Sequence, residues 1–277
     1  MIAILGTGLL GSGFARALRK KGETVHVWNR TFARAKALEA EGCVALSDAA
    51  EAVKGASRVH VVVSDDAAVD SVLDQAKLPS GARVYDHTTT STAGARERTA
   101  RWRERGVTYL HAPVFMGPQN AAESTGLMLV SGDRQVLAEA TPALATMTGK
   151  LVDLGDQPGR AAAFKLLGNL FLMALAAGFA DMIALGKAMG IAPAEIAALF
   201  ESFNPGVSVP ARFKRMIAAD YDDVSWDLAM ARKDARLMEG EGAKLVMLPG
   251  VIGLMETMLA RGHGEQDWTV IAQDLLR

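Results

Sequence analysis

The sequence predicts an α/β domain with a mostly parallel sheet, followed by an all-α domain. In the first half, short β-rich runs alternate with helical stretches, the rhythm of a parallel sheet with helices on both faces. β-Branched runs stop after Leu151-Val152-Asp153-Leu154, and from Gly159 the pattern is helical and rich in Ala, Leu and Met. Turn residues cluster at Asp156-Gln157-Pro158-Gly159, so we place the boundary there, with domains at 1–158 and 159–277.

The elements of the first domain follow from its apolar runs and its capping residues. We expect helices over 11–21 and over 31–41, the second with Thr31 as its cap, and a further helix capped by Ser47 or Asp48. A stretch at 96–105 with five arginines predicts a solvated helix. The expected strands are 2–5, 24–28, 43–46, 58–63, 83–85 and 107–110.

Composition excludes several classes of partner. The 277 residues can bury a substantial core, and 30 Lys and Arg against 31 Asp and Glu leave a formal net charge of -1. With no basic excess we expect no nucleic-acid partner. The single cysteine, Cys43, excludes a disulfide within the chain and favours a reducing compartment, so we expect a cytoplasmic protein with a buried structural thiol.

One apolar stretch, 161–189, has the length of a membrane span. Lys165, Asn169, Asp181 and Lys187 interrupt it, and the uncharged part between Lys165 and Asp181 is shorter than the ~18–20 residues a span requires. We therefore expect a buried helix and no membrane partner.

A glycine-rich turn follows the first strand and predicts a dinucleotide site. Glycine allows a sharp turn, close approach of a pyrophosphate and tight packing of the helix on the strand, and the helix N-terminus favours the anion. The required context, a strand before and a helix after, is present. The turn comprises Gly6, Thr7, Gly8, Leu9, Leu10 and Gly11.

The end of the second strand predicts NADP(H) as the cofactor. NAD enzymes usually place Asp or Glu there for the ribose 2′-hydroxyl, but this strand ends in Asn29-Arg30-Thr31. No carboxylate repels a 2′-phosphate, and Arg30 offers a cationic fork. The alternative is that Arg30 only caps a solvated loop.

Lys165 and Asn169 are the candidate catalytic pair. Their i, i+4 spacing puts both on one face of a helix. A partly desolvated lysine can deliver a proton to a carbonyl oxygen during reduction, and the amide can hold the lysine or the substrate. The alternative is a lysine that extends past Phe164 and Leu166 into solvent.

Together these residues resemble the β-hydroxyacid dehydrogenase family, which includes 3-hydroxyisobutyrate dehydrogenases and glyoxylate/succinic semialdehyde reductases. The resemblance covers essentially the whole chain. Besides the glycine turn and 29–31, it rests on Val63-Ser64-Asp65, on Asp86 to Ser91, on Ala112-Pro113-Val114, on Gly159 to Asn169 and on Lys233-Asp234.

The resemblance implies a Rossmann domain and an all-helical domain joined by a long helix, with dimers or tetramers formed through the helical domains. It implies Lys165 as the general acid/base, with Asn169 orienting it or the substrate. Val63, Ser64, Asp65 and Thr89 would line the cofactor cleft. Lys233 would contact the cofactor from the helical domain.

One departure affects the substrate. The family commonly continues the Ala-Pro-Val stretch with Ser-Gly-Gly, which receives a substrate carboxylate, whereas this chain has Phe115-Met116-Gly117. We expect these three residues to contact the substrate in a more apolar pocket. The principal hypothesis is NADP-dependent hydride transfer on a small carbonyl or alcohol of the β-hydroxyacid or semialdehyde type. The alternatives are reduction of cyclic imines or apolar ketones and a catalytically silent NADP-binding sensor.

The histidines predict no further chemistry. No two are spaced as metal ligands, so we expect no metal site. His87 adjoins the cofactor loop without an apparent partner in the sequence.

Overall fold

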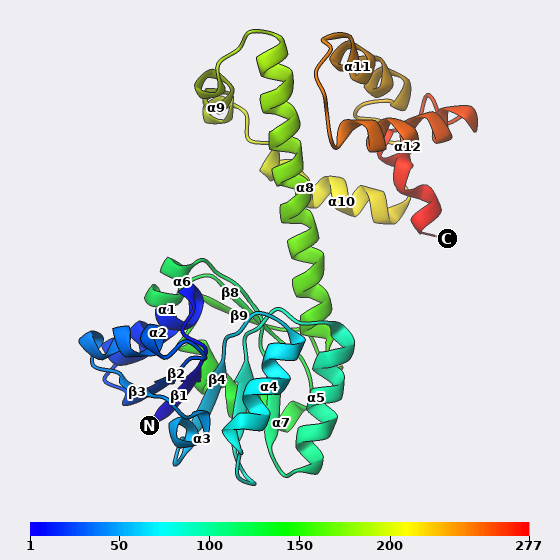
Figure 1. Cartoon of the computed structure of the whole chain (residues 1–277). Coiled ribbons are helices and arrows are strands. Elements are labelled where there is room, and N and C mark those ends of the chain that lie inside the picture. Colours follow the sequence, from blue (N-terminus) through cyan, green and yellow to red (C-terminus); the bar gives the residue numbers. More distant parts are fainter. Residues whose placement is uncertain (277) are drawn as a thin grey trace. The chain divides into compact units, whose positions relative to one another are not determined.

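The computed structural model describes residues 1–276, and the chain forms two compact units, Met1–Asn169 and Leu170–Arg277 (Figure 1). The first unit is the α/β domain and the second is helical, as expected from the sequence. The helix α8 (Arg160–Ala188) begins in the first unit and continues into the second.

A six-stranded parallel sheet organises the first unit. Its order is β3-β2-β1-β4-β5-β6, the order of a dinucleotide-binding Rossmann sheet, and it confirms the predicted parallel arrangement. The strand order reverses at β1, because β2 and β3 lie on one side of β1 and β4 lies on the other. This reversal leaves a crevice at the carboxyl ends of β1 and β4. The strands are β1 (Ile2–Leu5), β2 (Val25–Trp28), β3 (Val44–Leu46), β4 (Arg58–Val61), β5 (Arg83–Asp86) and β6 (Thr108–His111).

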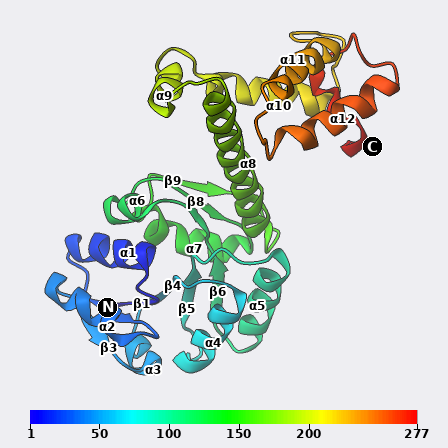
Figure 2. The same cartoon turned by 45° about the horizontal axis from the view of Figure 1, so that its top comes forward.

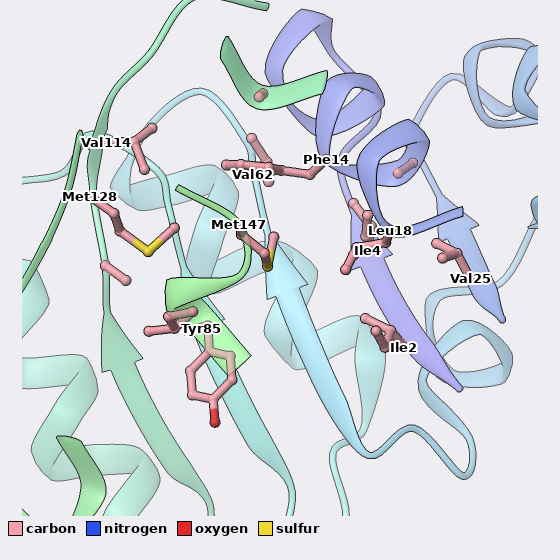
Figure 3. Packing of buried hydrophobic residues seen from close by; sticks show 14 of the residues in the cluster. Ile2, Ile4, Phe14, Leu18, Val25, Val62, Tyr85, Val114, Met128 and Met147 are labelled. Atoms are coloured by element: carbon pink, nitrogen blue, oxygen red, sulfur yellow. The ribbon is translucent and has the colours of Figure 1, made fainter. Parts of the chain in front are cut away.

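The sheet is buried on both faces because helices cover each face. Alternate strand residues point to opposite sides and so contribute to two separate cores. Ile2 and Ile4 belong to the core shared with α1, while Ala3 and Leu5 belong to the core beneath α3, α4 and α5. In Figure 3 the side chain of Ile4 lies beside Leu18 of α1. The helices of this unit are α1 (Leu9–Lys20), α2 (Phe32–Lys36), α3 (Ala49–Val53), α4 (Asp66–Ala76), α5 (Thr92–Glu104), α6 (Pro118–Glu123) and α7 (Arg134–Ala145), with the 3₁₀ helix η1 (Ala37–Glu41).

A second, three-stranded sheet was not predicted from the sequence. It comprises β7 (Val114–Phe115), β8 (Leu127–Val130) and β9 (Lys150–Asp153). Strand β7 is antiparallel to β8, and β9 is parallel to it. Figure 2 shows β8 and β9 side by side at the top of the first unit. The two-residue strand β7 carries no periodic signal. Strand β8 has a single β-branched residue, Val130, after three residues without a branched Cβ, so pairing rather than propensity defines both strands.

One local expectation for the first unit held in part, and another was wrong. Thr31 stands at the N-cap of α2 without a side-chain capping bond, and the predicted helix 31–41 divides into α2 and η1. Arg98 on α5 is not solvated but almost fully buried, at 2% exposure. An ion pair with Asp66 at 2.5 Å and a hydrogen bond to the Tyr109 hydroxyl at 3.0 Å compensate its burial.

Within residues 170–276, the second unit consists of helices and connecting loops, with one bridge between Asp227 and Asp267. Its small core contains residues of α11, α12 and η3, among them Leu228, Met258 and Val270. Asp181 of α8 accepts hydrogen bonds from the backbone N–H groups of Val246, Met247 and Leu248, and it thereby caps α12. The elements are α9 (Pro193–Ser202), η2 (Pro205–Ser208), α10 (Val209–Ala218), α11 (Leu228–Gly240), α12 (Leu248–Ala260) and η3 (Trp268–Leu275).

Helix α8 is not the buried helix predicted from 161–189. It is long and apolar enough to cross a membrane by length and composition, and only 6% of its most apolar window is buried in the chain. Leu167, Leu170 and Met173, for example, are 60%, 65% and 68% exposed. The single chain therefore leaves an apolar surface without cover.

The first turns of α8 belong to the first unit. Ala161 and Ala162 are fully buried, and the Ala161 N–H donates to Ser131 Oγ at 2.9 Å. The compact unit thus extends to Asn169, past the boundary at 158 inferred from turn residues, because these turns pack on the second sheet and its flanking loop. Lys165 and Asn169 consequently belong to the same compact unit as the glycine turn.

Candidate active site

A cleft of about 790 Å³ lies at the carboxyl ends of β1, β2, β4 and β5. Most of the predicted cofactor residues line it: Gly6, Gly8, Leu9, Leu10, Asn29, Arg30, Thr31, Val63, Ser64, Asp65 and Thr89. Thr7 and Gly11 are buried behind this lining. Lys165, Asn169 and Phe115 are not among the lining residues and form a separate cluster.

Close packing dictates two glycines of the turn. Gly6 has φ +102°, and a Cβ there would overlap the Val62 carbonyl oxygen. A Cβ at Gly11 would overlap the carbonyl oxygen of Gly6. These glycines allow α1 to begin directly against the sheet, which aims the N-terminus of α1 into the cleft.

Gly8 has a different role, because a Cβ at this position would meet no atom within 4 Å. Packing does not require glycine there, but an open approach to the backbone does. Gly8 is the N-cap of α1, no side chain caps this helix, and its first turn has no acidic residue. The initial N–H groups and the helix dipole therefore remain available to an anion, and this part of the cleft fits the pyrophosphate of a dinucleotide.

Asn29 supports the glycine turn from β2. Its Oδ1 accepts the Thr7 N–H at 3.1 Å, and its Nδ2 donates to the Thr31 carbonyl at 3.1 Å. The amide therefore holds the loop, and the hydrogen-bonding partner offered to a cofactor phosphate is Arg30. Arg34, which sequence analysis missed, also lines the cleft. Both arginines are exposed, and neither forms an ion pair within residues 1–276.

The only carboxylate in the lining is already engaged. Asp65 caps α4 by accepting the Ala68 N–H at 2.8 Å, and it accepts the Ser64 hydroxyl at 2.8 Å. The Ala68 N–H bond, followed by the Ser64 bond, lowers the pKa of Asp65. This carboxylate belongs to the helix start, whereas the end of β2 presents cationic side chains.

A buried network fixes the wall of the cleft after β5. Asp86 accepts the Thr88 N–H at 2.9 Å and the Tyr109 hydroxyl at 2.6 Å. The Thr88 hydroxyl in turn accepts the Val63 N–H at 3.1 Å, which ties the β4 and β5 loops together. Thr89, half-buried between these anchored residues, is thereby presented to the cleft.

His87 has a partner that the sequence did not reveal. Its Nε2 lies 2.9 Å from Nδ1 of the buried His60, and its Nδ1 lies 2.7 Å from the Ala112 carbonyl oxygen. A carbonyl only accepts, so His87 Nδ1 carries the proton, His60 Nδ1 donates to His87 Nε2, and Arg58 donates to His60 Nε2. Burial lowers the pKa of His87 to about 4, and therefore both rings are neutral at pH 7.

Lys165 and Asn169 meet as their spacing predicted. The Lys165 ammonium donates to Asn169 Oδ1 at 2.9 Å, and it lies 4.1 Å from the centroid of the Phe115 ring. The lysine is only 9% exposed, which excludes a side chain extended into solvent. Desolvation lowers the pKa of Lys165, the direction that makes a lysine a better proton donor near neutral pH.

The residues after Ala112-Pro113-Val114 are placed by β7 and α6. Phe115 and Met116 are half-buried. The Gly117 N–H donates to Asn120 Oδ1 at 2.9 Å at the start of α6. This N–H is thus engaged within the protein, and Phe115 brings an aromatic ring instead of a hydroxyl to Lys165.

The remaining predicted residue lies in the second unit. Lys233 is on α11 and pairs with Asp234 at 2.5 Å. Within residues 1–276 no cluster of three His, Cys, Asp or Glu side chains could hold a metal ion. Sequence reasoning missed Arg34 and His87 as lining residues. A basic residue one turn after Arg30 was a signal for the first, whereas the role of His87 depends on a contact 27 positions away.

Comparison with known proteins identifies the family. Residues 1–155 match the family described as the NAD binding domain of 6-phosphogluconate dehydrogenase. A NAD-dependent L-serine dehydrogenase of Pseudomonas aeruginosa is 29% identical and aligns over 98% of this chain and 96% of that protein.

Solved structures share the two-domain fold. An imine reductase from Myxococcus stipitatus in complex with NADP+ superposes with a TM-score of 0.92 at 21% identity, over 99% of both chains. A reductive aminase from Aspergillus terreus in complex with NADPH4, cyclohexanone and allyl amine superposes with a TM-score of 0.90 at 23% identity, over 100% of this chain and 99% of that one. The glycine turn, the sheet order and the family match agree, and the chain belongs to the β-hydroxyacid dehydrogenase family as an NAD(P)-dependent oxidoreductase.

Proposed function

We propose that this protein is an NADPH-dependent reductase of a small carbonyl compound, with Lys165 as the proton donor. The observation that carries the proposal is the buried Lys165 ammonium, held by Asn169 at 2.9 Å on a helix of the unit that also contains the cofactor cleft. Bound NADPH would supply the hydride to the carbonyl carbon. The developing alkoxide takes its proton from Lys165 Nζ, and in the reverse direction the neutral amine removes the alcohol proton.

The preference for NADPH over NADH is supported by the charge at the end of β2. The glycine turn and the N-terminus of α1 would hold the pyrophosphate, and Arg30 with Arg34 would pair with a 2′-phosphate. The P. aeruginosa relative is named NAD-dependent, whereas the end of β2 in this chain carries Arg30 and is followed by Arg34. Val63, Ser64 and Thr89 would line the nicotinamide end of the cleft.

A second candidate is the reduction of cyclic imines or apolar ketones. It is favoured by the half-buried Phe115 and Met116, which bring apolar surface, and by the Gly117 N–H already bonded to Asn120. Two solved structures with the same fold are described as an imine reductase and a reductive aminase. Retention of Lys165 with Asn169 favours the carbonyl reaction. A silent NADP sensor would have no use for a buried ammonium held in this way.

Steady-state kinetics test these proposals. Glyoxylate, succinic semialdehyde, cyclohexanone and a cyclic imine are offered with NADPH and with NADH. We expect Lys165→Ala to lower kcat by about 10²–10⁴-fold on the carbonyl substrate with NADPH binding nearly intact. The exposed Lys187, on the same helix, provides the control Lys187→Ala. Near-normal turnover of Lys165→Ala would exclude Lys165 as the proton donor.

The same assay decides the cofactor and the alternatives. Arg30→Ala and Arg34→Ala should each lower kcat/KM for NADPH by about 10–100-fold and leave that for NADH nearly unchanged. An equal or higher kcat/KM with NADH in the wild type would exclude the NADPH preference. Turnover of the imine alone would favour imine reduction, and tight NADPH binding without turnover of any substrate would favour a sensor.

We further propose a cytoplasmic homodimer or homotetramer assembled through the helical domain, without a membrane partner. The exposed apolar side chains of α8 and the single cysteine support this proposal. We expect a detergent-free lysate to keep the protein in the supernatant, and sedimentation velocity to give at least twice the 29.3 kDa chain mass. Leu170→Lys and Met173→Lys should dissociate the assembly. A monomeric wild type or a protein that requires detergent would contradict it.

A further inference from the structure

Phe115 contacts helix α8 at Gly168 as well as at Lys165. On α8, Lys165, Gly168 and Asn169 are at i, i+3 and i+4 and therefore share a face. A Cβ added to Gly168 would overlap Cζ of Phe115 and would lie 2.6 Å from its Cε1. The ring thus rests in a gap that only glycine leaves open.

A glycine inside a helix needs such a reason. Glycine in a helix interior costs about 1 kcal/mol relative to alanine. Gly178, on the same helix, differs from Gly168 because a Cβ there would be only in ordinary contact, 3.6 Å from Met247. Gly168 is therefore the glycine of α8 whose missing side chain admits an aromatic ring beside the candidate proton donor.

Strand β7 of the second sheet fixes the backbone that carries the Phe115 ring. Phe115 pairs with Leu127 in the second sheet, and the preceding Val114 is buried in the main core. The carbonyl oxygen of Ala112, three residues before Phe115, accepts a hydrogen bond from His87 in the wall of the cofactor cleft. The position of the ring is therefore set by the same framework that shapes the cleft.

We propose that Phe115, seated against Gly168, is the positioning residue of Lys165: its ring face and the Asn169 amide together fix the ammonium from which the proton is delivered. This inference rests on the proposed role of Lys165. The aromatic face attracts the cation at 4.1 Å, within the ~6 Å range of cation–π attraction. The ring also takes the place of water at the ammonium and leaves Asn169 as its hydrogen-bonding partner.

The ring and the burial of Lys165 act in opposite directions on proton affinity. Burial lowers the pKa of the lysine, whereas the ring favours its charged form. Reduction requires protonated Lys165, so activity falls as pH rises through this pKa. Removing the ring while keeping apolar bulk should move the alkaline limb of kcat to lower pH.

The variants follow from the geometry. Phe115→Leu keeps apolar volume but lacks Cε and Cζ, the ring atoms that lie nearest to the Gly168 position. We expect its alkaline limb to move down by roughly 0.4–1.5 pH units, with KM for NADPH within about twofold of the wild type. Gly168→Ala displaces the ring and should shift the limb in the same direction and lower kcat about tenfold or more. Gly178→Ala is the matched control and should leave both unchanged.

A double-mutant cycle separates positioning from general damage. Added to Phe115→Leu, the Gly168→Ala change should alter kcat by less than about threefold, because the clashing atoms are already gone. Equal effects of Gly168→Ala in both backgrounds, or a Phe115→Leu profile that coincides with the wild type, would refute the proposal. If Gly168→Ala does not fold, the profile of Phe115→Leu decides alone.

A readout independent of turnover distinguishes this inference from the proposed function. In protein labelled with [13Cε]lysine, the Lys165 signal is identified by its loss in Lys165→Arg. Its ε protons should lie upfield through the ring current, and this shift should disappear in Phe115→Leu without cofactor or substrate present. An unshifted wild-type signal overturns the positioning role. A shifted signal in a protein whose Lys165→Ala variant keeps full turnover instead overturns the proposed function, and only the contact between the ring and the ammonium then stands.

Discussion

Acidification should destabilise the first unit through the paired histidines beneath the cofactor cleft. His87 is 2% exposed, and burial lowers its pKa to about 4 from an ordinary value of 6.5. Between these values the unfolded chain binds a proton at His87 and the folded chain does not. The contribution of His87 to the free energy of unfolding is therefore fully present above pH 6.5 and is lost as pH falls toward about 4.

The magnitude follows from this window. One proton of difference changes the free energy of unfolding by about 1.4 kcal/mol per pH unit, and His87 alone accounts for about 3 kcal/mol across the window. His60, fully buried beside it, has a pKa lowered well below its usual value and acts in the same direction. His87→Asn removes one titrating ring while an amide N–H can still reach the Ala112 carbonyl.

Urea unfolding between pH 4.5 and 7.5 measures this effect. Trp28 and Trp102 lie in the first unit, so a Trp226→Phe, Trp268→Phe background makes tryptophan emission report on that unit alone. We expect His87→Asn to be less stable at pH 7, since His60 loses its acceptor, and to show a pH slope smaller by about one proton. Equal slopes in the variant and its parent would refute the neutral, buried histidine pair.

Three further outcomes are expected. Gly8→Ala should leave the thermal midpoint unchanged and weaken NADPH binding at least tenfold. Gly6→Ala should unfold the first unit, because the Cβ at position 6, unlike that at position 8, would overlap the backbone. Equal losses of stability in the two variants would contradict this distinction. Asp181→Ala removes three backbone hydrogen bonds at α12 and should destabilise the second unit by about 2–3 kcal/mol in urea, followed by the emission of its tryptophans; an unchanged midpoint would exclude the capping role. Lys233→Ala should raise KM for NADPH about threefold to tenfold at unchanged thermal midpoint, and an unchanged KM would remove Lys233 from the cofactor site.

Local pattern was sufficient for much of the fold and for the two motifs. The run Ile2 to Leu5, the glycine turn and the following helix are contiguous, so their geometry depends on backbone sterics and neighbouring residues. The i, i+4 spacing likewise suffices to place Lys165 beside Asn169, because both lie on one helix. The same reasoning failed for β7 and β8, whose pairing comes from the partner strand.

Burial was the main quantity that local pattern misjudged. The apolar stretch 161–189 predicted a buried helix. Hydrophobicity indicates that a surface is removed from water, but it does not indicate whether the same chain or another molecule buries it. Arg98 shows the reverse case, because a charged residue became almost fully buried once Asp66 and Tyr109 supplied its partners.

The sequence by itself therefore determined the fold class, the dinucleotide turn, the cationic end of β2 and the lysine–asparagine pair, all of which depend on residues close together in the chain. The tertiary structure alone decided that Phe115 rests against Gly168 beside Lys165 and that His60 hydrogen-bonds to His87. Such contacts join residues 27 to 53 positions apart, and no periodicity records them, because the sheets and α8 bring these residues together only after folding.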